Sequence, residues 1–158
     1  MTFISPGRIE VTEQQTLAES GFFKLLDFQL MDWDEDKAVL ELEIGPQHLN
    51  RAKVLHGGVV ASMIDLAGGF AGCYCAVPGR IRKAVTLSMT TSFTGQATSG
   101  VVRAVGRRRA GGRSIFFATV EITDAFGAMI ALGEGTYRYR RGSETPDGEA
   151  VATSEVNP

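Results

Sequence analysis

Residues 56–79, HGGVVASMIDLAGGFAGCYCAVPG, form the least polar stretch of the sequence. Between Gly57 and Gly79 the only side chain that is charged at neutral pH is Asp65. About 20 apolar residues suffice to span a bilayer, so a transmembrane helix is one reading. A central carboxylate is costly in lipid, however, and glycines interrupt the run. The stretch therefore predicts a long helix buried in protein.

Strand patterns continue on both sides of this predicted helix. Residues 37–44 alternate between apolar and polar side chains, as in a half-buried strand, and residues 29–34 are expected to pair with them. Residues 16–28 predict a short amphipathic helix, with Thr16 as N-cap and Glu19 as its capping-box partner. Four more strands are expected after the apolar stretch, joined by short turns as one antiparallel meander, over residues 85–93, 101–109, 114–123 and 128–139.

Length and composition predict one compact domain and exclude several classes of partner. The chain has 158 residues, is 44% hydrophobic and carries a net charge of −2, so it gives no overall field that would draw nucleic acid or an anionic membrane. The two cysteines, Cys73 and Cys75, are expected to be reduced core thiols, and with His48 and His56 isolated no metal site is expected. The first residues contain no signal-peptide core, which favours a cytoplasmic location.

A long apolar helix between strands needs a surface that covers most of its sides. A curved antiparallel sheet wrapped around one central helix does this, which is the α+β arrangement of the hot-dog fold. The expected organisation is an N-terminal extension over residues 1–15, a hot-dog domain over residues 16–141 and a disordered tail over residues 142–158. A sheet edge left free in one subunit is expected to be paired or covered by a second copy.

Asp65 is the first candidate for chemistry, because burial along the helix disfavours a charged carboxylate unless hydrogen-bond donors or water compensate. A general base or nucleophile would justify that cost, although a carboxylate that only bonds a neighbouring hydroxyl is also possible. Gly57 and Gly58 come where the helix begins, and their N–H groups are suited to bind a developing oxyanion. The alternative is that the two glycines only let the chain turn tightly.

The spacing of His56 and Asp65 predicts a site shared by two chains. Nine residues put them about 13.5 Å apart along one helix and on opposite faces. Two copies with antiparallel central helices could bring His56 and Gly57 of one chain to Asp65 of the other. Dimerisation is then a condition of activity.

Residues 50–69, NRAKVLHGGVVASMIDLAGG, resemble the motif of PaaI-type and 4-hydroxybenzoyl-CoA-type hot-dog thioesterases. The resemblance covers about residues 17–140 and rests mainly on Asn50, His56, Gly57, Gly58 and Asp65. It implies hydrolysis of an acyl-coenzyme A, in which the carboxylate activates water or attacks the carbonyl and the Gly57 amide binds the carbonyl oxygen. Asn50 and His56 then orient the water or the carbonyl. A hydroxyl that assists the carboxylate is implied on the next strand, with Thr86 the first choice and Ser88 the second.

The same resemblance implies where coenzyme A binds and how the chains assemble. Coenzyme A is part of the substrate, no cofactor is implied, and relatives are commonly tetramers of two dimers. The arginines of RRRAGGR are suited to bind phosphates, but a solvated basic hairpin is the alternative. The expected substrate-binding residues are Gly58, Phe93, Thr94, Gly95, Gln96, Arg109, Gly112, Arg113, Ser114 and Arg138.

Two other functions are compatible with these residues. One is a non-catalytic acyl-CoA sensor, since fold alone does not fix function, although such a protein has no need of a buried base. The other is a hot-dog hydratase or dehydratase, whose usual pattern is not found here. The acyl specificity is left open, because Val59, Met63, Phe70 and Met89 could line an acyl pocket but are equally explained as core.

Overall fold

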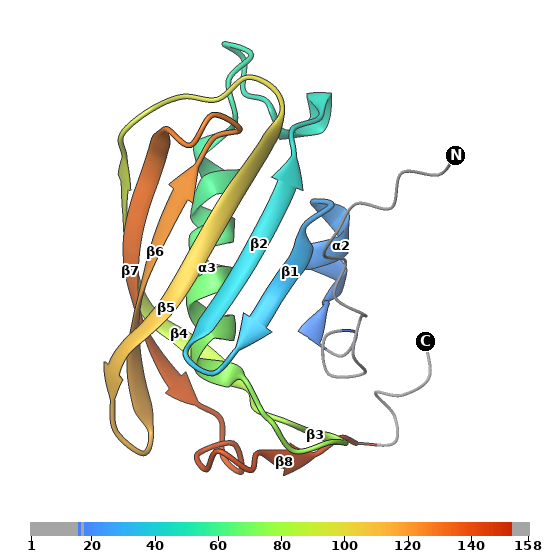
Figure 1. Ribbon diagram of the computed structural model, residues 1–158, viewed down its shortest axis with the longest axis vertical. Coiled ribbons are helices and arrows are strands. Elements are labelled where there is room, and N and C mark those ends of the chain that lie inside the picture. The colour runs from blue at the N-terminus through green and yellow to red at the C-terminus, as the bar shows by residue number, and fades with distance from the viewer. Residues whose placement is uncertain (1–15, 17, 153–158) are drawn as a thin grey trace.

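The computed structural model describes residue 16 and residues 18–152, and it has the expected α+β architecture (Figure 1). The long helix α3 lies along the concave face of one antiparallel sheet. The elements are α2 (Gly21–Leu25), β1 (Gln29–Asp34), β2 (Lys37–Glu43), the 3-10 helix η1 (Pro46–His48), α3 (Gly57–Cys73), β3 (Arg80–Ile81), β4 (Ala84–Phe93), β5 (Val101–Gly111), β6 (Ile115–Thr123), β7 (Met129–Tyr139) and β8 (Glu149–Ala150).

The order of the strands corrects the predicted four-strand meander. The main sheet runs β1-β2-β5-β6-β7-β4, so β4 pairs with β7 and lies at an edge, while β2 pairs with β5. The segment 94–100 carries the chain across the end of the sheet, as Figure 1 shows, and Thr94 N–H and Gly95 N–H both donate to the Ile130 carbonyl there. The predicted meander holds for β5, β6 and β7, which pair in sequence order, and was wrong only for β4. Alternation shows which face of the sheet a side chain occupies, not which strands are neighbours.

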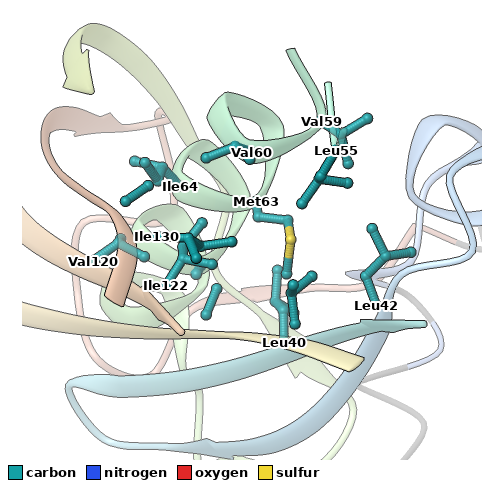
Figure 2. Close-up of a cluster of buried hydrophobic side chains, with 14 of the residues drawn as sticks. Leu40, Leu42, Leu55, Val59, Val60, Met63, Ile64, Val120, Ile122 and Ile130 are labelled. Carbon is teal, nitrogen blue, oxygen red and sulfur yellow. The ribbon is translucent and has the colours of Figure 1, made fainter. Parts of the chain in front are cut away.

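The main core forms where α3 meets the inner face of the sheet (Figure 2). Met63 and Ile64 of the helix are fully buried, as are Leu40 and Leu42 of β2. The helix approaches β5 closely at Gly106, where an added Cβ would lie 2.2 Å from the Ala67 carbonyl oxygen. A side chain at Gly106 would therefore push α3 off the sheet.

Side chains of the sheet bind the carbonyl groups at the C-terminal end of α3. Trp33 Nε1 donates to the Phe70 carbonyl at 2.7 Å, and the Tyr139 hydroxyl donates to the Gly72 carbonyl at 2.6 Å. The last carbonyls of a helix have no partner within the helix, so these bonds satisfy groups that would otherwise be unpaired. They also fix the position of the helix relative to β1 and β7.

The predicted helix over residues 16–28 is only partly correct. Ser20, rather than Thr16, is the N-cap of α2, and its side chain accepts from Phe23 N–H at 3.3 Å. The helix ends at Leu25 because the chain soon takes a left-handed conformation at Asp27, where φ is 56°. The predicted capping box of Thr16 and Glu19 therefore does not open α2.

The segment after residue 141 differs from the predicted disordered tail. Strand β8 pairs with β3, and Ser143 is fully buried. Arg80 donates to the carbonyls of Asp147 and Gly148, and Arg82 donates to those of Ser143 and Glu144. The absence of an apolar pattern was misleading because arginine side chains, rather than a hydrophobic face, hold this segment. Residues 1–15 and 153–158 of the predicted extension and tail lie outside the described residues.

Candidate functional site

The loop before α3 is held by its own side chains. Asn50 Oδ1 accepts from the N–H groups of Ala52 at 2.9 Å and Val54 at 3.1 Å. Both of these bonds use the amide oxygen of Asn50, so its NH₂ group is the part left to act as a donor. The buried His48 accepts from Gly45 N–H through Nδ1, and its Nε2 lies 3.0 Å from the Leu26 carbonyl. His48 is thus a structural residue.

His56 ends this loop and caps α3. Its Nδ1 accepts from Gly58 N–H at 2.8 Å. The first residue of the helix, Gly57, has no acceptor for its N–H group within the described part of the chain. Of the two amides predicted to bind an oxyanion, Gly58 is therefore occupied by the cap and Gly57 is left.

A hollow of about 390 Å³ lies beside Gly57. It is lined by Asn50, Gly57 and residues 93–96 among others, so six of the predicted site residues meet there. The ring of Phe93 lies close to Gly57, since an added Cβ would be 3.3 Å from two of its carbons. Asn50, His56 and Gly57 are called the amide half-site below.

Asp65 lies in the middle of α3 and is bound by residues from two strands. The Thr86 hydroxyl of β4 donates to Asp65 Oδ1 at 2.6 Å, and the Tyr137 hydroxyl of β7 lies 3.3 Å from the Asp65 carbonyl oxygen. The register of β4 shifts between Thr86 and Ser88, and Ser88 lines a hollow on the other face of the sheet. The geometry thus favours Thr86 over Ser88. Asp65, Thr86 and Tyr137 are called the carboxylate half-site.

Asp65 is less buried than the sequence suggested. It is half-buried, because its side chain faces a cavity of about 310 Å³ that Thr86 and Tyr137 also line. The short bond from Thr86 is charge-assisted when Asp65 is ionised, and it orients the carboxylate toward the cavity. Such a group can accept a proton from a molecule bound in the cavity.

Two buried groups near this cavity are held in their neutral form. Burial raises the pKa of the Cys73 thiol to about 12, against the opposing effect of the Arg82 charge. Burial also raises the pKa of Tyr137, and the charge of Asp65 adds to the shift. The Tyr137 hydroxyl therefore serves as a hydrogen-bond donor at neutral pH.

The two half-sites do not meet within one chain. His56 and Asp65 are separated by an unbroken helix, and no described residue lines both cavities. The sequence predicted this separation from the helical rise alone. A site that contains both half-sites therefore requires a second chain or a different path of the main chain between His56 and Asp65.

The predicted coenzyme A contacts of the basic hairpin line neither the cavity beside Gly57 nor the cavity beside Asp65. Arg109 donates to the Thr119 hydroxyl and lines hollows on the outer face of the sheet. Gly112 and Arg113 line a separate hollow near the C-terminal end of α3. The Ser114 carbonyl accepts from Tyr139 N–H, and Arg138 is exposed. One chain does not bring these predicted coenzyme A contacts to the amide half-site.

Sequence reasoning missed Tyr137, Trp33 and the cationic residues that line the Asp65 cavity. Tyr137 could have been placed on the inner face from the alternation of β7. Its contact with Asp65 could not, because it depends on how α3 lies across the sheet. Among residues 16 and 18–152, no group of three His, Cys, Asp or Glu side chains could hold a metal ion. No helix in that same part of the chain is long and apolar enough to span a bilayer.

Comparisons with known proteins agree with this fold. The sequence profile of the thioesterase superfamily matches residues 52–131, and the chain belongs to that family. A putative esterase of Archaeoglobus fulgidus is 28% identical over 138 residues, which cover 87% of this chain and 86% of the relative. Acyl-coenzyme A thioesterase 13 of Mus musculus is 28% identical over 121 residues, covering 73% of this chain and 83% of the relative.

A solved structure has the same fold as this chain. The PaaI protein from the phenylacetic acid degradation operon of Escherichia coli is 25% identical and superposes with a TM-score of 0.71. The alignment covers 81% of this chain and 90% of that protein. The predicted hot-dog fold of the thioesterase superfamily is confirmed, and the PaaI protein is among the structures that this chain resembles.

Proposed function

We propose that this protein hydrolyses the thioester bond of an acyl-coenzyme A, in a site that combines the carboxylate half-site of one chain with the amide half-site of another. The hydrogen bond from Thr86 to Asp65 carries this proposal. It joins residues 21 positions apart and holds a carboxylate at the edge of a cavity, where a general base is needed.

The edge strand β4 is the surface that would bring two chains together. It has no neighbour on its outer side among the described strands, yet Leu87 is 49% exposed and Phe93 is 59% exposed. Proteins usually protect a long apolar edge, and a second copy of the same strand would pair with it under a twofold axis. The helices of the two copies would then run antiparallel, with Gly57 of one chain toward Asp65 of the other.

In the proposed mechanism Asp65 acts as the general base. Thr86 holds one carboxylate oxygen, and the other takes a proton from water. The resulting hydroxide adds to the thioester carbonyl carbon, and the negative charge on the carbonyl oxygen is stabilised by the Gly57 N–H and the Asn50 NH₂ group. The C–S bond then breaks, and the proton passes from Asp65 to the departing thiolate. The products are a carboxylic acid and coenzyme A.

The family and the named activity of a relative support this proposal. The matched mouse protein is an acyl-coenzyme A thioesterase, and the match includes most of this chain. Assembly as a dimer, or as a tetramer of two dimers, and a cytoplasmic location belong to the same proposal. No cofactor is required, because the mechanism uses only water and side chains of the protein.

The test is release of free thiol from a panel of acyl-coenzyme A thioesters. The intact protein is expected to release thiol, and Asp65→Asn is expected to lower kcat by about 10²- to 10⁴-fold, the usual contribution of a general base. Asp147→Asn is the matched control, because it makes the same chemical change at an exposed position. Binding of coenzyme A without thiol release from either protein would contradict the proposal and favour the non-catalytic sensor.

A further inference from the structure

The cavity beside Asp65 is a trench that runs along α3. Its helical wall is formed by Asp65, Leu66, Gly69, Phe70 and Cys73, which lie on one face of the helix. At 1.5 Å per residue, the distance from Asp65 to Cys73 along the axis is about 12 Å. Asp65 is therefore at one end of the trench. An acyl group whose carbonyl lies at Asp65 would extend toward the C-terminal end of the helix.

The middle of the trench is apolar and has room for a chain. Phe70 packs against Trp33 of β1, with ring centroids 5.4 Å apart, and both rings line the trench. Gly69 contributes no side chain, and an added Cβ would meet the Tyr137 ring only at 3.6 Å. The volume of about 310 Å³ is at the small end of the range for ligand pockets. The trench fits a short or medium acyl group.

The far end of the trench is cationic. Arg82, Lys83 and Arg140 line it, and Asp65, at the opposite end, is the only acidic side chain among the described residues of the lining. The Arg82 guanidinium donates to three backbone carbonyls, which are neutral acceptors. Lys83 faces Glu149 at 3.6 Å, and Arg140 is held beside Lys83 by a backbone hydrogen bond. Positive charge therefore remains in excess at this end.

We infer that the trench binds acyl groups that end in a carboxylate, so the substrates are mono-thioesters of coenzyme A with a dicarboxylic acid. This inference rests on the proposed thioesterase function. The apolar middle accepts the methylene groups, while Arg140, beside the Lys83–Glu149 ion pair, binds the terminal carboxylate. From Thr86 to Lys83 the strand direction spans about 10 Å, so an acid of about six carbons is expected to fit best.

The experiment compares kcat/KM for adipoyl-coenzyme A and hexanoyl-coenzyme A, which have the same number of acyl carbons. The intact protein is expected to prefer adipoyl-coenzyme A by about tenfold, which corresponds to one charge-assisted interaction of about 1.4 kcal/mol. Arg140→Gln is expected to lower this ratio several-fold. Arg141→Gln is the matched control, since Arg141 is the exposed neighbour that does not line the trench, and it should leave the ratio unchanged.

Each other outcome has a definite meaning. Equal losses on both substrates in Arg140→Gln would assign these cations to the phosphates of coenzyme A and overturn the inference. A preference for hexanoyl-coenzyme A in the intact protein would also overturn it, while leaving the thioesterase function intact. If neither substrate nor any other acyl-coenzyme A is cleaved, the proposed function fails and the inference fails with it.

Discussion

The amide half-site and the carboxylate half-site are built in opposite ways. Asn50, His56 and the groups that they bind lie within nine residues of sequence, from Asn50 to Gly58. Asp65, Thr86 and Tyr137 come from α3, β4 and β7, and they meet only because the sheet wraps around the helix. The first half-site is therefore encoded locally, whereas the second depends on the whole fold. The proposed active site needs one of each from different chains.

Mixing two variants that are each inactive is expected to have the largest effect, because each variant lacks a different half-site. Gly57→Pro removes the N–H at the first helical position, where proline is tolerated, and His56 already has the extended conformation that a following proline requires. This variant is expected to lose about 10²- to 10³-fold in kcat, as does removal of an oxyanion donor elsewhere. Gly57→Ala keeps the N–H and serves as its control.

Co-refolding Gly57→Pro chains with Asp65→Asn chains tests the shared site directly. Random pairing gives half heterodimers, and each heterodimer has one intact site, so about a quarter of the wild-type activity is expected to return. The measurement is thiol release before and after mixing. Activity that stays at the level of the two parents would mean that each chain uses its own residues, and the shared site would be wrong.

Alkaline pH is expected to lower the free energy of unfolding through two buried groups near the carboxylate half-site. The Cys73 thiol ordinarily has a pKa of 9.0, and burial raises it to about 12 in the folded chain. The unfolded chain therefore releases this proton first as the pH rises. The stabilisation is complete below pH 9 and is lost as the pH rises through 12. In this window Cys73 lowers the free energy of unfolding by about 1.4 kcal/mol per pH unit, and the raised pKa of Tyr137 acts in the same direction.

Urea unfolding at several pH values checks this expectation. Cys73→Ala should unfold more easily at neutral pH, because it leaves a small cavity, but its stability should fall less steeply above pH 9. Between pH 7 and pH 8 both proteins should have similar slopes, which provides the internal control. Equal slopes above pH 9 would show that the thiol titrates normally in the folded chain.

Thr86→Val is expected to have the smallest effect of these variants, and it changes a single hydrogen bond. It keeps the shape of the side chain and removes the hydroxyl that binds Asp65, so kcat should fall about tenfold, corresponding to one hydrogen bond to a charged group. Thr86→Ser retains the hydroxyl and should restore most of the rate. A decrease in stability without a change in the pH profile of kcat would reduce Thr86 to a structural role.

The correctly predicted features of the fold are those that depend on periodicity. Alternation identified the strands, and the apolar stretch identified α3, although the predicted N-terminal helix was too long. The position of β4 was missed, because the seven residues 94–100 are long enough to reach either a neighbouring or a distant strand. The ordered structure after residue 141 was missed as well. Arg80 and Arg82 stabilise that segment by donating to its backbone carbonyls, and an apolar face is not needed.

Local residue spacing is sufficient to form the amide half-site, because hydrogen bonds between residues two to four positions apart need only local geometry. It also determined that His56 and Asp65 of one chain lie far apart, since the helical rise is fixed. The three-dimensional fold is needed to bring Thr86 rather than Ser88 to Asp65, to place Tyr137 against the same turn of α3, and to gather cations at one end of the trench. These contacts depend on the register of β4 and on the placement of the helix across the sheet, which long-range packing sets.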